Sequence, residues 1–208
     1  MCRVTDICSP SIGSPYGAPR YGARVIADIH LLADGVQMRP AALTDAHALA
    51  EAFRRNREHL RPWDPVRPES FFTYEGQLTR LAGLLGDRDA GRAMPWLLFD
   101  ADRVIGAVNL GNIALGPFRS AGLGYWLDGG QTGRGLATAA VETVCRSARD
   151  DLGLHRVEAG TILENAASQR VLAKCGFQEI GIAPRYLSIN GAWRDHRLFQ
   201  RILHEREA

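Results

Sequence analysis

The stretch "GYWLDGGQTGRGLATAA", residues 124–140, constrains the fold more than any other part of the chain. It passes from an aromatic, strand-like run to an alanine-rich run with helical spacing, through four glycines and no proline. A strand that ends at Asp128 and a helix that begins near Gly133 leave backbone N–H groups without helical partners. Glycine permits positive φ and close approach to the backbone, and the helix dipole adds partial positive charge. The junction therefore predicts a strand, an anion-binding turn and a helix.

Apolar spacing predicts the elements on the N-terminal side of this junction. The run "GVQMRPA" reads as a strand, Thr44 can cap a helix after it, and Ser70 can cap a second helix beyond a proline-broken loop over 57–70. From residue 94 the apolar period becomes two. That change predicts a meander of three antiparallel strands, "MPWLLFD", "VIGAVNLGNIA" and "SAGLGYWLD".

On the C-terminal side, a helix to about residue 150 and the strand "HRVEAGTIL" complete a strand-helix-strand crossover. Asn165 can cap a shorter helix that ends at Gly176. The dipeptide "NG" at 190–191 joins the last two strands as a hairpin. A meander, a crossover and a hairpin together predict a mixed sheet.

The length of the chain favours one domain. A chain of 208 residues with 46% hydrophobic content can build one sizeable core. Residues 1–22 mix proline, glycine and serine with little apolar periodicity, so we expect a poorly ordered N-terminal arm that is dispensable. Residues 23–208 are then a single domain.

Charge and cysteine usage exclude several classes of partner. A net charge of +2 gives no electrostatic case for nucleic acid or a membrane surface as the main partner. Four cysteines, at positions 2, 8, 145 and 175, lack CxxC spacing, which indicates reduced thiols and no zinc site. We expect no metal. No secretory signal or long apolar run is present, which favours the cytoplasm.

The glycine junction alone can be read in three ways, of which two remain open. The first is a tight turn with no ligand. A P-loop drops out, because "GRGLAT" lacks the Lys and Ser/Thr that such a loop needs. A dinucleotide-binding fold has a glycine-started helix and Glu158 at a suitable distance in its favour. The antiparallel meander before the junction argues against it.

Four motifs in order resemble the GCN5-related N-acetyltransferase (GNAT) superfamily, and its RimJ/RimL group in particular. They are "GYWL", "TGRGLATAA", "ENAASQRVLAKCGF" and "WRDH", and the resemblance covers about residues 36–203. It implies an α+β (mixed α/β) GNAT fold, whose central, mostly antiparallel twisted sheet has helices on both faces. It also implies acetyl-CoA as co-substrate, with the pyrophosphate at the glycine junction. Thr132 departs from the family's motif, which affects one side-chain contact.

By this resemblance the coenzyme lies along the junction and the two splayed strands beside it. The implied coenzyme-binding residues are Trp126, Leu127, Asp128, Thr132, Gly133, Arg134, Gly135, Leu136, Ala137, Thr138, Asn165 and Ser168.

Two residues are candidates for the chemistry of acyl transfer. Ser168, three residues after the cap Asn165, is implied by the RimL type as the group that protonates the leaving thiolate. Its other reading is a first-turn polar residue. Glu158 stands mid-strand and is implied as the general base, although an acidic residue there can also lie on a solvated face. Asp195 and His196 of "WRDH" are alternatives that we read as structural, and His155 as a strand-start residue.

The implied acceptor is a protein or peptide N-terminus that begins with Ala or Ser, with ribosomal proteins as the substrate class. Trp63, Tyr186 and Trp193 lie on two long segments that can form an open groove for an extended peptide, so we assign them to substrate binding. Acetylation of a small amine, such as an antibiotic or polyamine, is the alternative. A non-catalytic acyl-CoA-binding module is another. Monomer and homodimer are equally compatible with the sequence.

Overall fold

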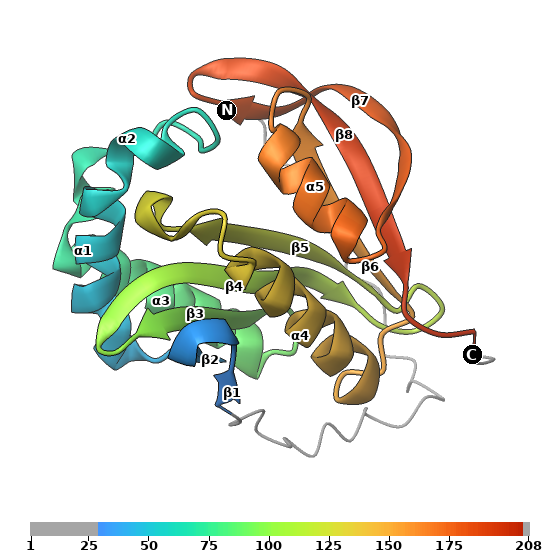
Figure 1. Cartoon of the computed structure of the whole chain (residues 1–208), viewed down its shortest axis with the longest axis horizontal. Coiled ribbons are helices and arrows are strands. Elements are labelled where there is room, and N and C mark those ends of the chain that lie inside the picture. The colour runs from blue at the N-terminus through green and yellow to red at the C-terminus, as the bar shows by residue number, and fades with distance from the viewer. Residues whose placement is uncertain (1–28, 206–208) are drawn as a thin grey trace, which may run out of the picture.

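One sheet of eight strands organises the computed structural model, which describes residues 29–205 of the chain (Figure 1). The strand order is β1-β2-β3-β4-β5-β6-β8-β7. The β5–β6 pair is parallel and every other neighbouring pair is antiparallel. The strands are β1 (His30–Leu31), β2 (Gln37–Pro40), β3 (Met94–Asp100), β4 (Arg103–Ala114), β5 (Ser120–Leu127), β6 (Arg156–Ile162), β7 (Gln178–Ile189) and β8 (Ala192–Ile202).

Helices cover both faces of this sheet (Figure 1). They are α1 (Ala46–Arg55), α2 (Arg57–Leu60), α3 (Tyr74–Asp89), α4 (Leu136–Asp150) and α5 (Ala166–Lys174). A core of Leu49, Phe53 and Leu81 packs α1 and α3 against one face. On the other face, apolar residues of α4 and α5 such as Val144 and Leu172 pack over the strands. The mixed sheet, the meander and the crossover through α4 confirm the fold expected from the sequence.

The starts of the first two long helices differ from the sequence prediction. Thr44 lies inside a 3₁₀ turn, and the carboxylate of Asp45 accepts the N–H of Ala42 at 2.8 Å before α1 begins. A 3₁₀ turn (Glu69–Phe72) likewise contains Ser70, and the hydroxyl oxygen of Thr73 caps α3 by accepting an N–H at 3.1 Å. Both predicted caps were therefore wrong: Thr73 caps α3 in place of Ser70, and α1 begins directly after the 3₁₀ turn with no side-chain cap.

The later helix boundaries match the sequence. Asn165 caps α5, since its side-chain oxygen accepts the N–H of Ser168 at 3.0 Å. Gly176 follows the helix with φ of +71°. The "NG" turn joins β7 to β8 as expected. The segment 57–70, expected as a loop, contains the short helix α2, and residues 1–22 lie outside the described residues.

The parallel pair β5–β6 creates the space in which a site can form. Its register joins Ser120 to Arg156 and ends with Gly122 opposite Glu158. Beyond this rung β5 stays paired with β4, and β6 with β8. The two strands therefore diverge, and each leaves one backbone edge without a strand neighbour.

Candidate active site

A long hollow of about 1230 Å³ follows the end of β5 into the glycine junction. The starts of α4 and α5 form its sides, and α2 contributes His59 and Leu60. Of the residues that the sequence assigned to the coenzyme, ten line this hollow: Trp126, Leu127, Thr132, Gly133, Gly135, Leu136, Ala137, Thr138, Asn165 and Ser168. The structure thus brings most of the predicted set together on one surface.

The glycine turn has the backbone geometry that its sequence predicts. Gly133 and Gly135 have φ of +79° and +78°, a region that residues with a side chain rarely adopt. Gly135 stands directly before the first residue of α4. Within residues 29–205, the N–H groups of 133–138 donate no hydrogen bond to protein. A row of free donors at a helix start is a binding site for an anion such as a pyrophosphate.

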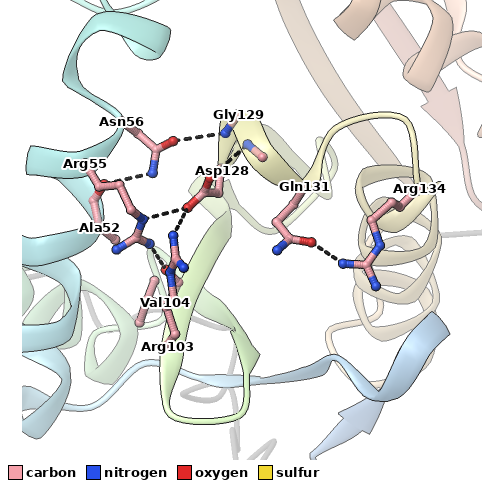
Figure 2. A network of polar contacts seen from close by, with 10 residues as sticks. Ala52, Arg55, Asn56, Arg103, Val104, Asp128, Gly129, Gln131 and Arg134 are labelled. Atoms are coloured by element: carbon pink, nitrogen blue, oxygen red, sulfur yellow. Dashed lines mark hydrogen bonds and ion pairs between the residues drawn. The ribbon is translucent and has the colours of Figure 1, made fainter.

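Asp128 does not line the hollow, contrary to its predicted role. Its carboxylate turns toward α1 and accepts a hydrogen bond from Nε of Arg55 at 2.8 Å (Figure 2). Arg103 reaches the same oxygen at 3.4 Å, and the N–H of Gly130 donates to the other oxygen at 3.0 Å. Asn56 completes the network by accepting the N–H of Gly129 at 2.9 Å. Asp128 therefore fixes the start of the turn to α1.

Two other residues of the turn also bind protein. Arg134, which was expected to contact the coenzyme, forms an ion pair with Asp34 at 2.8 Å. It also forms a hydrogen bond with Gln131 (Figure 2). The hydroxyl of Thr132 donates to the carbonyl of Gly129 at 3.1 Å and so closes the turn. The backbone N–H groups of this turn, rather than its side chains, are therefore available to bind a ligand.

The Asp128 network gives a stability prediction. The carboxylate is buried, which raises its pKa, and the hydrogen bonds from Arg55 and Gly130 outweigh this, so the net pKa is lowered. A lowered pKa means stability that is present above the unfolded pKa of about 3.9 and lost as pH falls through the folded pKa. We expect Asp128→Asn to lower the free energy of unfolding by about 2 kcal/mol at pH 7, with a smaller difference below pH 4.

Chemical denaturation at pH 7 and pH 3.5 would test this expectation. Asp89→Asn is the matched control, because Asp89 is an exposed partner of Arg88 at 2.9 Å and should cost little. An Asp128→Asn variant as stable as wild type at pH 7 would contradict the role of the network.

A second, shorter hollow of about 550 Å³ lies where β5 and β6 diverge. It shares Trp63, Tyr125, Asn165 and Ser168 with the long hollow, so the two hollows adjoin at these residues. Its remaining lining residues are Leu123, Gly124, Ala159, Gly160, Thr161, Ile162, Leu172 and His196. The junction of the two hollows is therefore a polar point between largely apolar walls.

Ser168 and Tyr125 form the polar centre of that junction. The tyrosine hydroxyl lies 2.7 Å from the serine Oγ and 3.2 Å from the serine carbonyl oxygen. Burial raises the pKa of Tyr125 to about 12, and the hydrogen bond with Ser168 offsets only part of that rise. The phenol thus keeps its proton at neutral pH. It can donate to Oγ, which leaves the serine proton free to point into the hollow.

Glu158 lies apart from this centre. It lines neither hollow, and its carboxylate forms an ion pair with Arg156 at 3.2 Å. Gly160, on the same face of β6 but two residues further on, reaches the hollow instead. The lining of the short hollow begins at the next residue, Ala159, and does not include Glu158. Its role as base stays a prediction.

The three aromatic residues assigned to substrate binding are placed differently. Trp63 lines both hollows. Tyr186 packs against His196, with ring centroids 5.3 Å apart, while Trp193 is 67% exposed on the β7–β8 hairpin. The two expected walls of the groove touch, because the N–H of Asn190 donates to the carbonyl of Asp64 at 3.0 Å. The groove is therefore bridged at the hairpin tip.

The sequence analysis missed several lining residues. Arg170 and Lys174 lie one helical turn apart on α5 and face the long hollow. Two cationic residues at i, i+4 spacing on one helix face could have been used to predict a binding site for an anion. Tyr125 had no such signal, because its partner Ser168 is 43 residues away in the chain.

Within the described chain, no cluster of His, Cys, Asp or Glu could hold a metal ion. Across the same range, every helix is too short or too polar to span a membrane.

Comparison with known proteins places this fold and site in a family. The acetyltransferase (GNAT) domain profile matches residues 36–178. The ribosomal protein uS5-alanine N-acetyltransferase of Escherichia coli (strain K12) is 34% identical over 175 residues, which cover 83% of this chain and 90% of that protein.

Solved structures agree with this match. The ribosomal-protein-S5-alanine acetyltransferase from Vibrio fischeri superposes with a TM-score of 0.80 at 37% identity, covering 83% of this chain and 96% of that one. Mycobacterium smegmatis RimJ in complex with CoA-disulfide gives a TM-score of 0.76 at 34% identity, with coverage of 80% and 81%.

The fold and the anion-binding turn thus define an acyltransferase of the N-acetyltransferase class. The chain belongs to the GCN5-related N-acetyltransferase (GNAT) family, and the resemblance to its RimJ/RimL group is confirmed.

Proposed function

We propose that this protein transfers the acetyl group of acetyl-CoA to the α-amine of a protein N-terminus that begins with Ala or Ser. Ribosomal proteins in the cytoplasm are the substrate class. The observation that carries the proposal is that a glycine turn with free N–H donors and the Ser168–Tyr125 centre line the same long hollow. Relatives named for the alanine of ribosomal protein S5 support the acceptor.

The residues of the long hollow suit each part of the coenzyme. The free N–H groups of 133–138 would receive the pyrophosphate, and Arg170 and Lys174 add positive charge beside it. The unpaired edges of β5 and β6 would hold the pantetheine arm as an added strand. That arrangement would lead the thioester to Ser168, whose hydroxyl can protonate the departing thiolate.

The short hollow suits a single α-amine better than a polycation. No aspartate or glutamate is among the described residues that line it, whereas small cationic amines are usually held by convergent carboxylates. Trp63 and Tyr186 offer flat aromatic surfaces near the junction for an extended backbone. We further propose that residues 23–208 act as one domain. This geometry disfavours the small-molecule alternative.

A peptide panel with acetyl-CoA tests the acceptor. We expect peptides that begin with Ala or Ser to be acetylated at the α-amine about two orders of magnitude faster than lysine side chains at pH 7.5. The α-amine pKa of about 7.7–8.0 leaves far more neutral nucleophile than the lysine pKa of about 10.4. Mass spectrometry with fragmentation locates the acetyl group. The same peptides with a blocked N-terminus are the control.

Acetylation of spermidine or an aminoglycoside, with every peptide left unmodified, would replace the proposed acceptor. The coenzyme assignment would survive that result. No transfer to any amine, together with intact binding of acetyl-CoA, would instead support the non-catalytic binding module.

A further inference from the structure

The short hollow contains a histidine that the sequence analysis treated as structural. His196 of β8 is 3% exposed and lines the hollow together with Tyr125 and Ser168. It stands directly opposite Ile162 in the antiparallel β6–β8 pair. Among the described lining residues it is the one imidazole, the side chain that most often serves as a general base in enzymes.

The hydrogen bond of this histidine fixes which nitrogen is free. Nδ1 lies 3.1 Å from the carbonyl oxygen of Arg194. A carbonyl oxygen can only accept, so Nδ1 must carry the proton in the neutral ring. Nε2 then holds an unshared lone pair, and within residues 29–205 it has no hydrogen-bond partner. The neutral imidazole is thereby set as a proton acceptor at Nε2.

The space beside the ring is open because β6 has a glycine there. A Cβ built on Gly160 would lie 3.6 Å from Cδ2 of His196, the ring carbon bonded to Nε2. The same Cβ would lie 3.8 Å from the ring of Tyr186. A side chain longer than a methyl group at position 160 would extend into the space beside the ring. Gly160 therefore leaves room for a substrate amine.

The rest of the "WRDH" motif holds the ring in this position. Asp195 accepts the N–H of Arg185 at 2.8 Å, at the point where the register of β7 shifts against β8. Arg185 has φ of +48°, and the irregularity turns Tyr186 onto His196. The two neighbours in the motif therefore have different tasks, since Asp195 braces the hairpin and His196 faces the hollow.

We propose that Nε2 of His196 is the general base that takes the proton from the incoming α-ammonium. The proposal rests on the proposed function. The neutral nitrogen then forms a C–N bond with the thioester carbonyl carbon, and the C–S bond breaks. The nitrogen loses two protons in all, and the net reaction leaves one on the coenzyme sulfur and one in solvent. Ser168 donates a proton to the coenzyme sulfur, and His196 accepts a proton from the substrate nitrogen.

The charged groups around His196 pair with other residues or flank it on its own strand. Within the described residues no carboxylate forms an ion pair with it. The neighbouring strands contribute the titratable groups Tyr186 on β7, Tyr125 on β5 and Glu158 on β6, and the carboxylate of Glu158 is paired with Arg156. On β8 itself, Arg194 and Asp195 flank His196, and Arg197 forms an ion pair with Glu179.

The test compares His196→Asn with Glu158→Gln across pH. Asparagine can keep a donor near the Arg194 carbonyl but lacks the base. For wild type, kcat/KM should rise at a lower pH than for His196→Asn, whose profile should follow the amine itself, near 7.7–8.0. We expect a loss of about 10²-fold at pH 7 that shrinks below tenfold at pH 9, where the amine is already neutral. Glu158→Gln should lose less than threefold at either pH, a value on the scale of one weak exposed ion pair.

Other outcomes are equally decisive. A pH-independent loss in His196→Asn, or a pH-dependent loss in Glu158→Gln alone, overturns the proposal. If the variant does not fold, NMR titration of His196 in wild type decides, because its pKa must coincide with the rising limb of kcat/KM. Failure of wild type to acetylate any peptide would instead count against the proposed function.

Discussion

Gly135→Asp is expected to abolish the stabilisation that CoA gives to the wild-type protein. A ligand that binds only the folded state raises the melting temperature, and about 2.7 kcal/mol is gained when its concentration is 100 times Kd. Gly135 has φ of +78°, and the N–H groups after it are free. An aspartate there brings a strained backbone and a negative charge to the predicted pyrophosphate site, so we expect KM for acetyl-CoA to rise at least about 10²-fold.

Thermal unfolding with and without CoA measures this effect. Gly135→Ala separates backbone strain from charge and should lose less of the CoA shift than Gly135→Asp. Gly153→Asp is the matched control, because Gly153 also has a positive φ, of +61°, but lies outside both hollows. A folded Gly135→Asp protein that keeps the full CoA shift would remove the glycine turn from coenzyme binding.

Ser168→Ala is expected to lower kcat by about 10²–10³-fold and to leave coenzyme binding almost unchanged. The serine Oγ lies at the polar junction of the two hollows and 2.7 Å from the Tyr125 hydroxyl. Stabilising the leaving thiolate matters mainly in the transition state, so its loss appears in kcat rather than in Kd. The cap of α5 should survive, because it uses the backbone N–H of residue 168.

Steady-state kinetics and CoA titration would separate the two effects. Tyr125→Phe should also lower kcat, because it removes the donor to Oγ. With the pKa of Tyr125 raised to about 12, wild-type activity should show no loss from phenol ionisation up to about pH 10. Equal turnover in Ser168→Ala and wild type would exclude Ser168 from the reaction.

The sequence by itself determined the parts that depend on local rules. The period of the apolar residues placed the meander, and the glycines placed the turn before α4. The Asn165 cap and the "NG" hairpin were equally readable, because a cap or a turn is decided by residues within a few positions. The predicted caps Thr44 and Ser70 were wrong, since α1 has no side-chain cap and the neighbouring Thr73 caps α3.

Only the tertiary structure decided which side chains meet at the site. The sequence marked Asp128 for the coenzyme, but its carboxylate turns to Arg55, 73 residues away. Ser168 was predicted without its partner Tyr125, because they meet only where β5 and β6 diverge. Insertion of β8 beside β6 brings His196 opposite Ile162, at the end of β6 that lines the short hollow, whereas Glu158 lines neither hollow. Local spacing fixes the face of a strand on which a residue lies, but the pairing of distant strands fixes what that face meets.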